Sequence, residues 1–288
     1  MAGNMKEIKE RIGSVKNTNQ ITRAMNIISS TKFKKYQELT LNSREYAHTI
    51  DVAFDNLVGS MKNNKHVIFD GKKEVRKIGV IMMTSDRGLC GAFNTSTFRK
   101  FEEMQKQFKL ENKEVSVIAI GRKAKDYCKN KGILIDAELS QLIPEIMFEK
   151  GREISEKIVD LYMKNHYDEV YLLYSRFISA IKYNLEVEKV LPIKLKREYL
   201  STNREYIFEP SESEVLRRFT PKALNIKLYQ ALLENTASEH SARMSAMQQA
   251  SDNAQEMINK LTLKYNRERQ AAITQELTEI VGGANALK

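Results

Sequence analysis

Residues 226–265 read IKLYQALLENTASEHSARMSAMQQASDNAQEMINKLTLKY and contain the most regular pattern in the chain. Positions that alternate by four and three residues are mostly apolar or small, and the pattern continues for more than five heptads. This spacing is typical of a helix that packs along another helix, and its length predicts supercoiling. The positions are Ile226, Gln230, Leu233, Ala237, His240, Met244, Met247, Ser251, Ala254, Ile258, Leu261 and Tyr265.

Helix start and stop signals bound this C-terminal helix. Thr220-Pro221 has the form of an N-cap followed by a proline at the first helical position, and Gly282-Gly283 has the form of a stop. Ser211, three residues before Glu214, indicates a short helix upstream of Thr220. We therefore expect residues 211–288 to form a short connecting helix and then the long C-terminal helix.

The N-terminal segment, residues 1–58, predicts a second long helix from Asn4 to Val58. It contains no proline, and about 55 helical residues would span roughly 80 Å, more than the width of a small domain. Two such helices at opposite chain ends can bury each other's apolar faces most simply as an antiparallel coiled coil. The expected stripe on the N-terminal helix consists of Ile8, Ile12, Val15, Ile21, Met25 and Ile28.

The middle of the chain, residues 72–210, changes character. Apolar runs of strand length alternate with segments of helical periodicity, a pattern typical of an open α/β sheet that is parallel for most of its width. The expected strands are 78–83, 115–121, 169–174 and an edge strand at 184–195, and the expected helices are 92–108, 122–130 and 145–164. The predicted fold class is α/β: a long antiparallel coiled coil of the terminal helices plus a central open-sheet domain.

Composition excludes several classes of protein. The 288 residues include only 12 glycines and 4 prolines, too few turn-formers for a compact all-β fold. Hydrophobic residues make up 42% and charged residues 29%, which excludes simple disorder. No apolar run is long enough to span a membrane, and residues 1–19 lack the apolar core of a signal peptide, so an intracellular protein is expected.

Motifs for covalent chemistry are absent or weak. Neither GxxxxGK[ST] nor GxGxxG occurs, and the segment from Ser85 to Gly91 is best interpreted as a structural strand-to-helix turn. Cys90 has no histidine nearby in sequence, and the four histidines lack metal-ligand spacing. His240 falls on the helical seam, where a packing role is expected. We expect no catalytic residue, no metal and no cofactor.

Charge and polarity indicate a protein partner. The net charge is +10, and residues 1–36 hold eight basic side chains against two acidic ones. A basic helix suits an acidic protein surface, while a coiled-coil scaffold for nucleic acid and an enzyme built on the central sheet stay open as alternatives. Residues 267–287 are polar around most of the helix and end in small apolar residues, so a surrounding partner should stabilise them.

Several motifs carry a resemblance to a known family, the gamma subunit of the bacterial F-type ATP synthase, which forms the central stalk of F1. The similarity runs from end to end, and its closing pattern is the most specific part. The redox-regulatory cysteine insertion of the chloroplast branch is missing. The matching residues are Met1-Ala2-Gly3, Lys6-Glu7-Ile8, Arg11-Ile12, Asn17-Thr18, Ile21-Thr22-Arg23-Ala24-Met25, Ser85 to Gly91, Ile273-Thr274, Glu276, Glu279 and Gly283-Ala284.

The resemblance implies a function and a set of partners. It implies a non-catalytic rotary shaft, one copy per complex, that couples ion-driven rotation of the membrane c-ring to the catalytic sites of a ring of alpha and beta subunits. The epsilon subunit is a further implied partner, nucleic acid is not, and the implied location is peripheral, on the cytoplasmic face of the bacterial cell membrane. Neither the coupling ion, proton or sodium, nor the main direction of the reaction follows from this chain.

The resemblance also carries over individual residues. Arg269, Gln270 and Thr274 match residues that hydrogen-bond a loop of the beta subunit. Arg23 and Met25 match the N-terminal region that faces an acidic lever of beta. The foot that meets the c-ring is matched by Tyr206 and Glu209.

Overall fold

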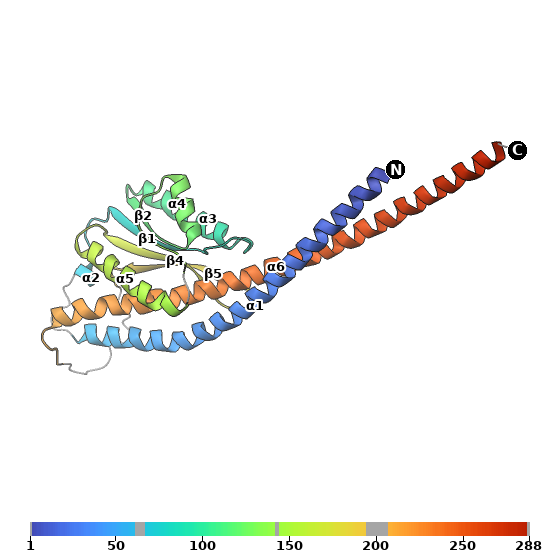
Figure 1. Cartoon of the computed structure of the whole chain (residues 1–288). Coiled ribbons are helices and arrows are strands. Elements are labelled where there is room, and N and C mark those ends of the chain that lie inside the picture. The colour runs from blue at the N-terminus through green and yellow to red at the C-terminus, as the bar shows by residue number, and fades with distance from the viewer. Residues whose placement is uncertain (1, 61–66, 142–143, 194–206, 287–288) are drawn as a thin grey trace. The chain divides into compact units, whose positions relative to one another are not determined.

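A computed structural model of the chain describes residues 2–60, 67–141, 144–193 and 207–286 (Figure 1). Two compact units are present: unit 1 holds the described parts of residues 1–30 and 243–288, and unit 2 those of residues 31–242. The predicted division into residues 1–58, 72–210 and 211–288 is a different one and stays a prediction. The elements are α1 (Ala2–Gly59), α2 (Val67–Asp70), β1 (Lys77–Met83), α3 (Phe93–Leu110), β2 (Glu114–Ile120), α4 (Arg122–Lys131), β3 (Ile135–Leu139), α5 (Pro144–Met163), β4 (Glu169–Phe177), β5 (Tyr183–Leu191) and α6 (Glu212–Ala286).

The two terminal helices are longer than predicted, with 58 residues in α1 and 75 in α6. The expectation of a separate connecting helix was wrong: α6 begins at Glu212 and continues through Pro221. Thr220 lies inside this continuous helix and so caps no helix start. Ser211 Oγ instead accepts the Glu214 N–H at 3.3 Å and caps the start of α6. The predicted stop at Gly282-Gly283 was also wrong, since glycine permits a helix end but does not require one.

Within each unit α1 and α6 run antiparallel. In unit 1, Asn26 Nδ2 donates to the Met244 carbonyl at 2.9 Å, and Asn19 Oδ1 accepts from Ser251 Oγ at 2.6 Å. In unit 2, Tyr36 stacks on His240 with ring centroids 5.5 Å apart, and Phe54 stacks on Phe219 at 5.6 Å. In each unit, partners further along α1 meet partners earlier on α6, which confirms the antiparallel pair.

The heptad prediction for α6 is confirmed. None of its twelve predicted seam residues is exposed, and eight of them are buried. In unit 2, His240 is 8% exposed and stacks on Tyr36 of α1 with ring centroids 5.5 Å apart, so its packing role is confirmed. Small residues such as Ala237 and Ala254 are buried along the seam, as close approach of a neighbouring backbone requires.

Unit 2 contains a five-stranded sheet in the order β3-β2-β1-β4-β5. The first four strands are parallel, and β5 pairs antiparallel with β4 at one edge. Four strands and three helices confirm the predicted open sheet. Strand β3 was not predicted, because its five residues, Ile135–Leu139, include two acidic side chains and only half-buried apolar ones.

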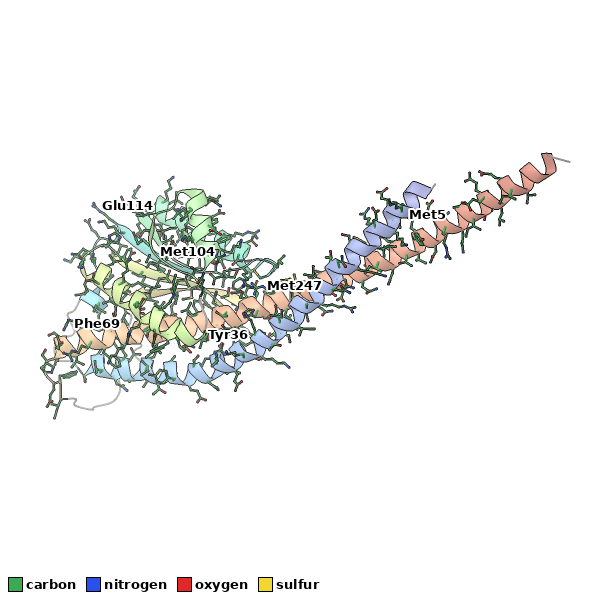
Figure 2. The ribbon with its side chains drawn as sticks, viewed as in Figure 1. Met5, Tyr36, Phe69, Met104, Glu114 and Met247 are labelled. Carbon is green, nitrogen blue, oxygen red and sulfur yellow. The ribbon has the colours of Figure 1, made fainter. Side chains whose placement is uncertain are left out.

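Two apolar layers cover the sheet of unit 2. One face of the sheet packs on α3 and α4, with Met104 and Phe101 fully or nearly buried there (Figure 2). The other face packs on α5 and on the unit 2 parts of α1 and α6. The long helices therefore supply one wall of the core of this α/β unit, rather than being attached to a closed domain.

A glycine after β2 and a buried aspartate before β4 shape the strand ends. Gly121 has φ +94°, and a Cβ there would lie 2.4 Å from the Thr84 carbonyl oxygen, so only glycine fits after β2. Asp168, before β4, accepts hydrogen bonds from Lys72 Nζ at 2.6 Å and from two backbone N–H groups at 2.8 Å. Burial opposes ionisation of Asp168, but these hydrogen bonds outweigh it and lower its pKa.

Candidate partner-binding surfaces

The outer face of α1 in unit 1 is unusually apolar. Ile21, Ile27 and Ile28 are 61%, 66% and 58% exposed. The buried side of the helix here instead carries Asn19 and Ser29. The predicted stripe was therefore wrong at Ile21 and Ile28, because polar residues that hydrogen-bond across the pair take the seam. A helix that buries polar side chains and exposes isoleucines is suited to a partner that covers it.

Ile27 was missed as a surface residue, although the sequence contains a signal for it. Ile27 and Ile28 are adjacent, and neighbouring positions on a helix point about 100° apart, so one narrow stripe cannot bury both. Of the two residues carried over by resemblance, Arg23 is exposed and Met25 is half-buried. Arg23 lies on the exposed face beside Ile27, which is four residues further along the helix. This surface of α1 thus combines positive charge with apolar area.

The last turns of α6 form a second surface in unit 1. Every residue of α6 from Ile273 to Gly282 is exposed, beyond the part of α6 where Ser251 pairs with Asn19 of α1. In Figure 2 the side chains of these turns project from a single helix. Their apolar members are exposed: Ile273 48%, Leu277 58%, Ile280 68% and Val281 58%.

Arg269, Gln270 and Thr274 all lie on this exposed end of α6. The Thr274 hydroxyl donates to the Gln270 carbonyl at 2.9 Å, so both residues share one face of the helix. No hydrogen bond or ion pair from the Arg269 guanidinium or the Gln270 amide to another described residue is seen, so both can bond a partner. The three residues therefore lie close together on the exposed helix end, and their contact with a loop of the beta subunit stays a prediction.

The predicted foot belongs to unit 2. Tyr206 lies outside the described residues. Glu209 is exposed just before α6, next to Ile207, which is 91% exposed. Phe208 between them packs on the small apolar cluster that contains Phe54 and Leu216, so the segment at Glu209 is attached to both long helices.

Side chains that could support metal or thiol chemistry lie apart or are buried in the described parts of the chain. No three metal-ligating side chains lie together there. Burial raises the pKa of Cys128 to about 11, and Cys90 is buried against Asn94, whose Nδ2 lies 3.3 Å from its sulfur. An open groove of about 560 Å³ runs along β3. Beside it, Lys125 bonds the Glu138 carboxylate and Lys157 bonds the Asp136 carbonyl, so both ammonium groups already have partners.

A membrane span is likewise not found: no helix in the described ranges combines the length and apolarity that crossing a bilayer needs.

The fold and the exposed surfaces define a class of protein, a protein-binding subunit. Its two long antiparallel helices present apolar and basic faces in unit 1, and an α/β sheet packs on the same two helices in unit 2. Comparison with known proteins agrees with this class. The sequence matches the family described as ATP synthase over residues 4–287. It is 49% identical to the ATP synthase gamma chain of Fusobacterium nucleatum over 283 residues, covering 98% of this chain and 99% of the relative.

A second relative, the ATP synthase gamma chain of Geobacter metallireducens, is 40% identical and covers 99% of both chains. Among solved structures, a chain of the central stalk and c-ring of Tetrahymena thermophila mitochondrial ATP synthase superposes with a TM-score of 0.62 at 25% identity, covering 80% of this chain and 99% of that one. A chain of Euglena gracilis mitochondrial ATP synthase reaches 0.70 at 21% identity, covering 100% and 95%. The chain belongs to the ATP synthase family, and the two relatives described above, which match over almost their whole length, are gamma chains.

Proposed function

We propose that this chain is the rotating central shaft of an F1Fo ATP synthase. It couples ion-driven rotation of the c-ring to conformational changes at the catalytic sites of the alpha–beta ring, and it catalyses no reaction itself. The observation that carries the proposal is the antiparallel α1–α6 pair of unit 1, which exposes isoleucines and the apolar end of α6 in a full-length relative of gamma chains.

The mechanism depends on unequal contacts. In unit 1 the basic, isoleucine-bearing face of α1 differs from the outer face of α6, so the pair is asymmetric around its own axis. Three otherwise equivalent sites around such a shaft would each meet a different surface. Differential contact free energy is what shifts a site between open and closed states, and rotation would move that bias from one site to the next.

The residue roles in this proposal are those that the resemblance implies. Arg269 and Gln270, with Thr274, would hydrogen-bond a loop of the beta subunit, and Arg23 and Met25 would face an acidic segment of beta. Tyr206 and Glu209 would meet the polar loops of the c-ring. The epsilon subunit is the remaining partner, and one chain per complex would be held peripherally at the cytoplasmic face of the bacterial membrane.

Assembly tests the proposal. The chain is mixed with alpha and beta subunits from the same source, and the complex is isolated and its stoichiometry measured by native mass spectrometry. We expect a ring that contains a single copy of this chain. If the chain does not join alpha and beta subunits, or if it instead binds DNA with a steep salt dependence, the proposal is wrong.

Two substitutions refine the test. Arg269→Ala and Gln270→Ala should each weaken coupling and assembly by about 1–3 kcal/mol, since each removes hydrogen bonds to a partner. The measurement is ATP synthesis driven by an ion gradient, per assembled complex. Wild-type synthesis rates in both variants would contradict the roles assigned to these residues.

A further inference from the structure

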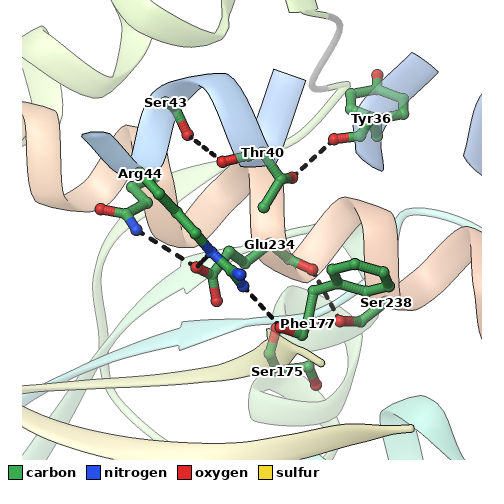
Figure 3. Close-up of polar contacts among 9 residues, drawn as sticks. Tyr36, Thr40, Ser43, Arg44, Ser175, Phe177, Glu234 and Ser238 are labelled. Atoms are coloured by element: carbon green, nitrogen blue, oxygen red, sulfur yellow. Dashed lines mark hydrogen bonds and ion pairs between the residues drawn. The ribbon is translucent and has the colours of Figure 1, made fainter. Parts of the chain in front are cut away.

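An ion pair whose carboxylate is buried joins three elements of unit 2. Arg44 on α1 donates from Nε to Glu234 Oε1 on α6 at 3.1 Å, and from Nη2 to the Phe177 carbonyl at the end of β4 at 2.7 Å (Figure 3). One guanidinium thus holds the second long helix and the sheet at the same time. Its side chain keeps 34% of its surface exposed, whereas that of Glu234 keeps 3%.

Further polar bonds between α6 and β4 surround this pair. Ser238 Oγ donates to the Ser175 carbonyl at 3.3 Å, and Asn235 Oδ1 accepts the Ser175 N–H at 3.1 Å. Gln230 Nε2 donates to Glu234 Oε1 at 3.3 Å, but Glu234 Oε2 is buried without a hydrogen-bond partner among the described residues. The carboxylate is therefore only partly compensated for its loss of water.

Stability alone does not explain such a pair. A buried ion pair is commonly no better than two well-packed apolar side chains, and a carboxylate oxygen without a partner makes this one worse. The apolar residues around it, such as Leu232, Leu233 and Ala237, already bury α6 against the core. A directional contact such as this ion pair can instead specify the position of one helix along the other.

Geometry makes the pair sensitive to axial shifts. Sliding one helix by a single turn moves its side chains by about 5.4 Å, which would break both guanidinium bonds. Apolar contacts in a heptad seam tolerate such a shift better, because equivalent residues recur every three or four positions. The fork of Arg44 also fixes α1 against β4 by a directional bond, beside the apolar contact of Phe33 with Phe177, whose ring centroids are 5.7 Å apart.

We propose that Arg44 and Glu234 are a positioning pair that fixes the axial register of α1 against α6 and β4 in unit 2. Resting on the proposed shaft function, we infer that this register is needed to transmit torque without slip, whereas folding and assembly do not require it.

The test compares removal of one partner with removal of both. Arg44→Met leaves the Glu234 carboxylate buried without its cation and is expected to reduce the amount of assembled complex. The double variant Arg44→Met/Glu234→Leu removes both charges and is expected to restore assembly. Arg44→Lys keeps the charge, but a single ammonium cannot reproduce the fork that reaches Glu234 and the Phe177 carbonyl. The control is Arg217→Met, which breaks an exposed pair with Glu214 on α6.

The readout is the coupling ratio of the complete ATP synthase in inverted membrane vesicles, that is, ion pumping per ATP hydrolysed and per assembled complex. We expect the double variant to assemble and hydrolyse ATP but to lose coupling by about threefold or more, with Arg44→Lys in between. Arg217→Met should match the wild type.

Two outcomes overturn the proposal. In the first, the double variant couples like the wild type, so register does not depend on the pair. In the second, the double variant fails to assemble although the wild type does, so the pair is only structural. Failure of the wild-type chain to join the complex would instead refute the shaft function itself.

Discussion

The exposed apolar end of α6 leads to a quantitative prediction. Leu277 and Ile280 are 58% and 68% exposed in unit 1. Fully burying such a side chain is worth about 1.5–3 kcal/mol, so a partner that covers the exposed remainder would gain about 1–2 kcal/mol from each residue. The double variant Leu277→Gln/Ile280→Gln should therefore weaken binding to the alpha–beta ring by about 3 kcal/mol, or about 100-fold in the dissociation constant.

The assay is a titration of the labelled chain into alpha and beta subunits, with circular dichroism of the isolated chain alongside. Exposed substitutions typically change stability by less than about 0.5 kcal/mol, and glutamine favours helix about as well as leucine. The melting curve of the isolated chain should therefore not change. Only the dissociation constant should respond.

A matched control comes from unit 2. Leu110 and Leu134 are 86% and 63% exposed, yet neither lies on the helical pair of unit 1. The double variant Leu110→Gln/Leu134→Gln also replaces two largely exposed aliphatic side chains by glutamine and should bind like the wild type. If the α6 variant also binds like the wild type, its apolar end is not covered by a partner, and the reasoning from exposure is refuted.

Three further predictions concern the fold. Asn19→Leu should keep or raise the melting temperature but loosen the register of the helical pair in unit 1. Spin labels on the two helices should then report a broadened distribution of distances. A single narrow distance would contradict this prediction. Gly121→Ala should lower the free energy of unfolding in urea by about 3 kcal/mol, because its Cβ would collide with the Thr84 carbonyl, whereas Gly13→Ala, with open space in mid-helix, should not be destabilising. Since the pKa of Asp168 is lowered by folding, its stabilisation is present above about pH 4 and lost on acidification, so Asp168→Asn should flatten the acid limb of the stability curve; an unchanged acid limb would show that another group controls it.

Predictions from local periodicity were reliable where one repeat dominates. All twelve seam positions on α6 avoid exposure, and strands β1, β2 and β4 lie where apolar runs indicated. These signals are local: a heptad or an apolar run reports how one helix face or one strand will be buried. The same logic failed at β3, whose five residues are only partly buried and therefore carry no apolar run.

Predictions that needed knowledge of a neighbour were less reliable. The stripe on α1 was wrong at Ile21 and Ile28, because Asn19 finds partners on Ser251 and Gln255, 232 and 236 residues away. The start of α6 was placed too late, because packing on both sides of Pro221 keeps the helix continuous. In both places tertiary contacts outweighed a local preference.

Some candidate functional residues could be identified from the sequence, and others only from the tertiary structure. Arg23, Arg269, Gln270 and Thr274 were identified through resemblance, and the structure places them on exposed helix surfaces. The pair formed by Arg44 and Glu234 has no sequence signal, since 190 residues separate its members.

Spacing of apolar residues along the chain was enough to predict two long helices and a mostly parallel sheet, because burial of a helix stripe or a strand has a short period that any segment displays. Which residues enter the seam, which isoleucines stay outside, and which charges meet in the core depended on the tertiary structure. The free energy of a hydrogen bond or ion pair exists only once both partners are brought together, and for Asn19 or Arg44 that partner lies at the other end of the chain.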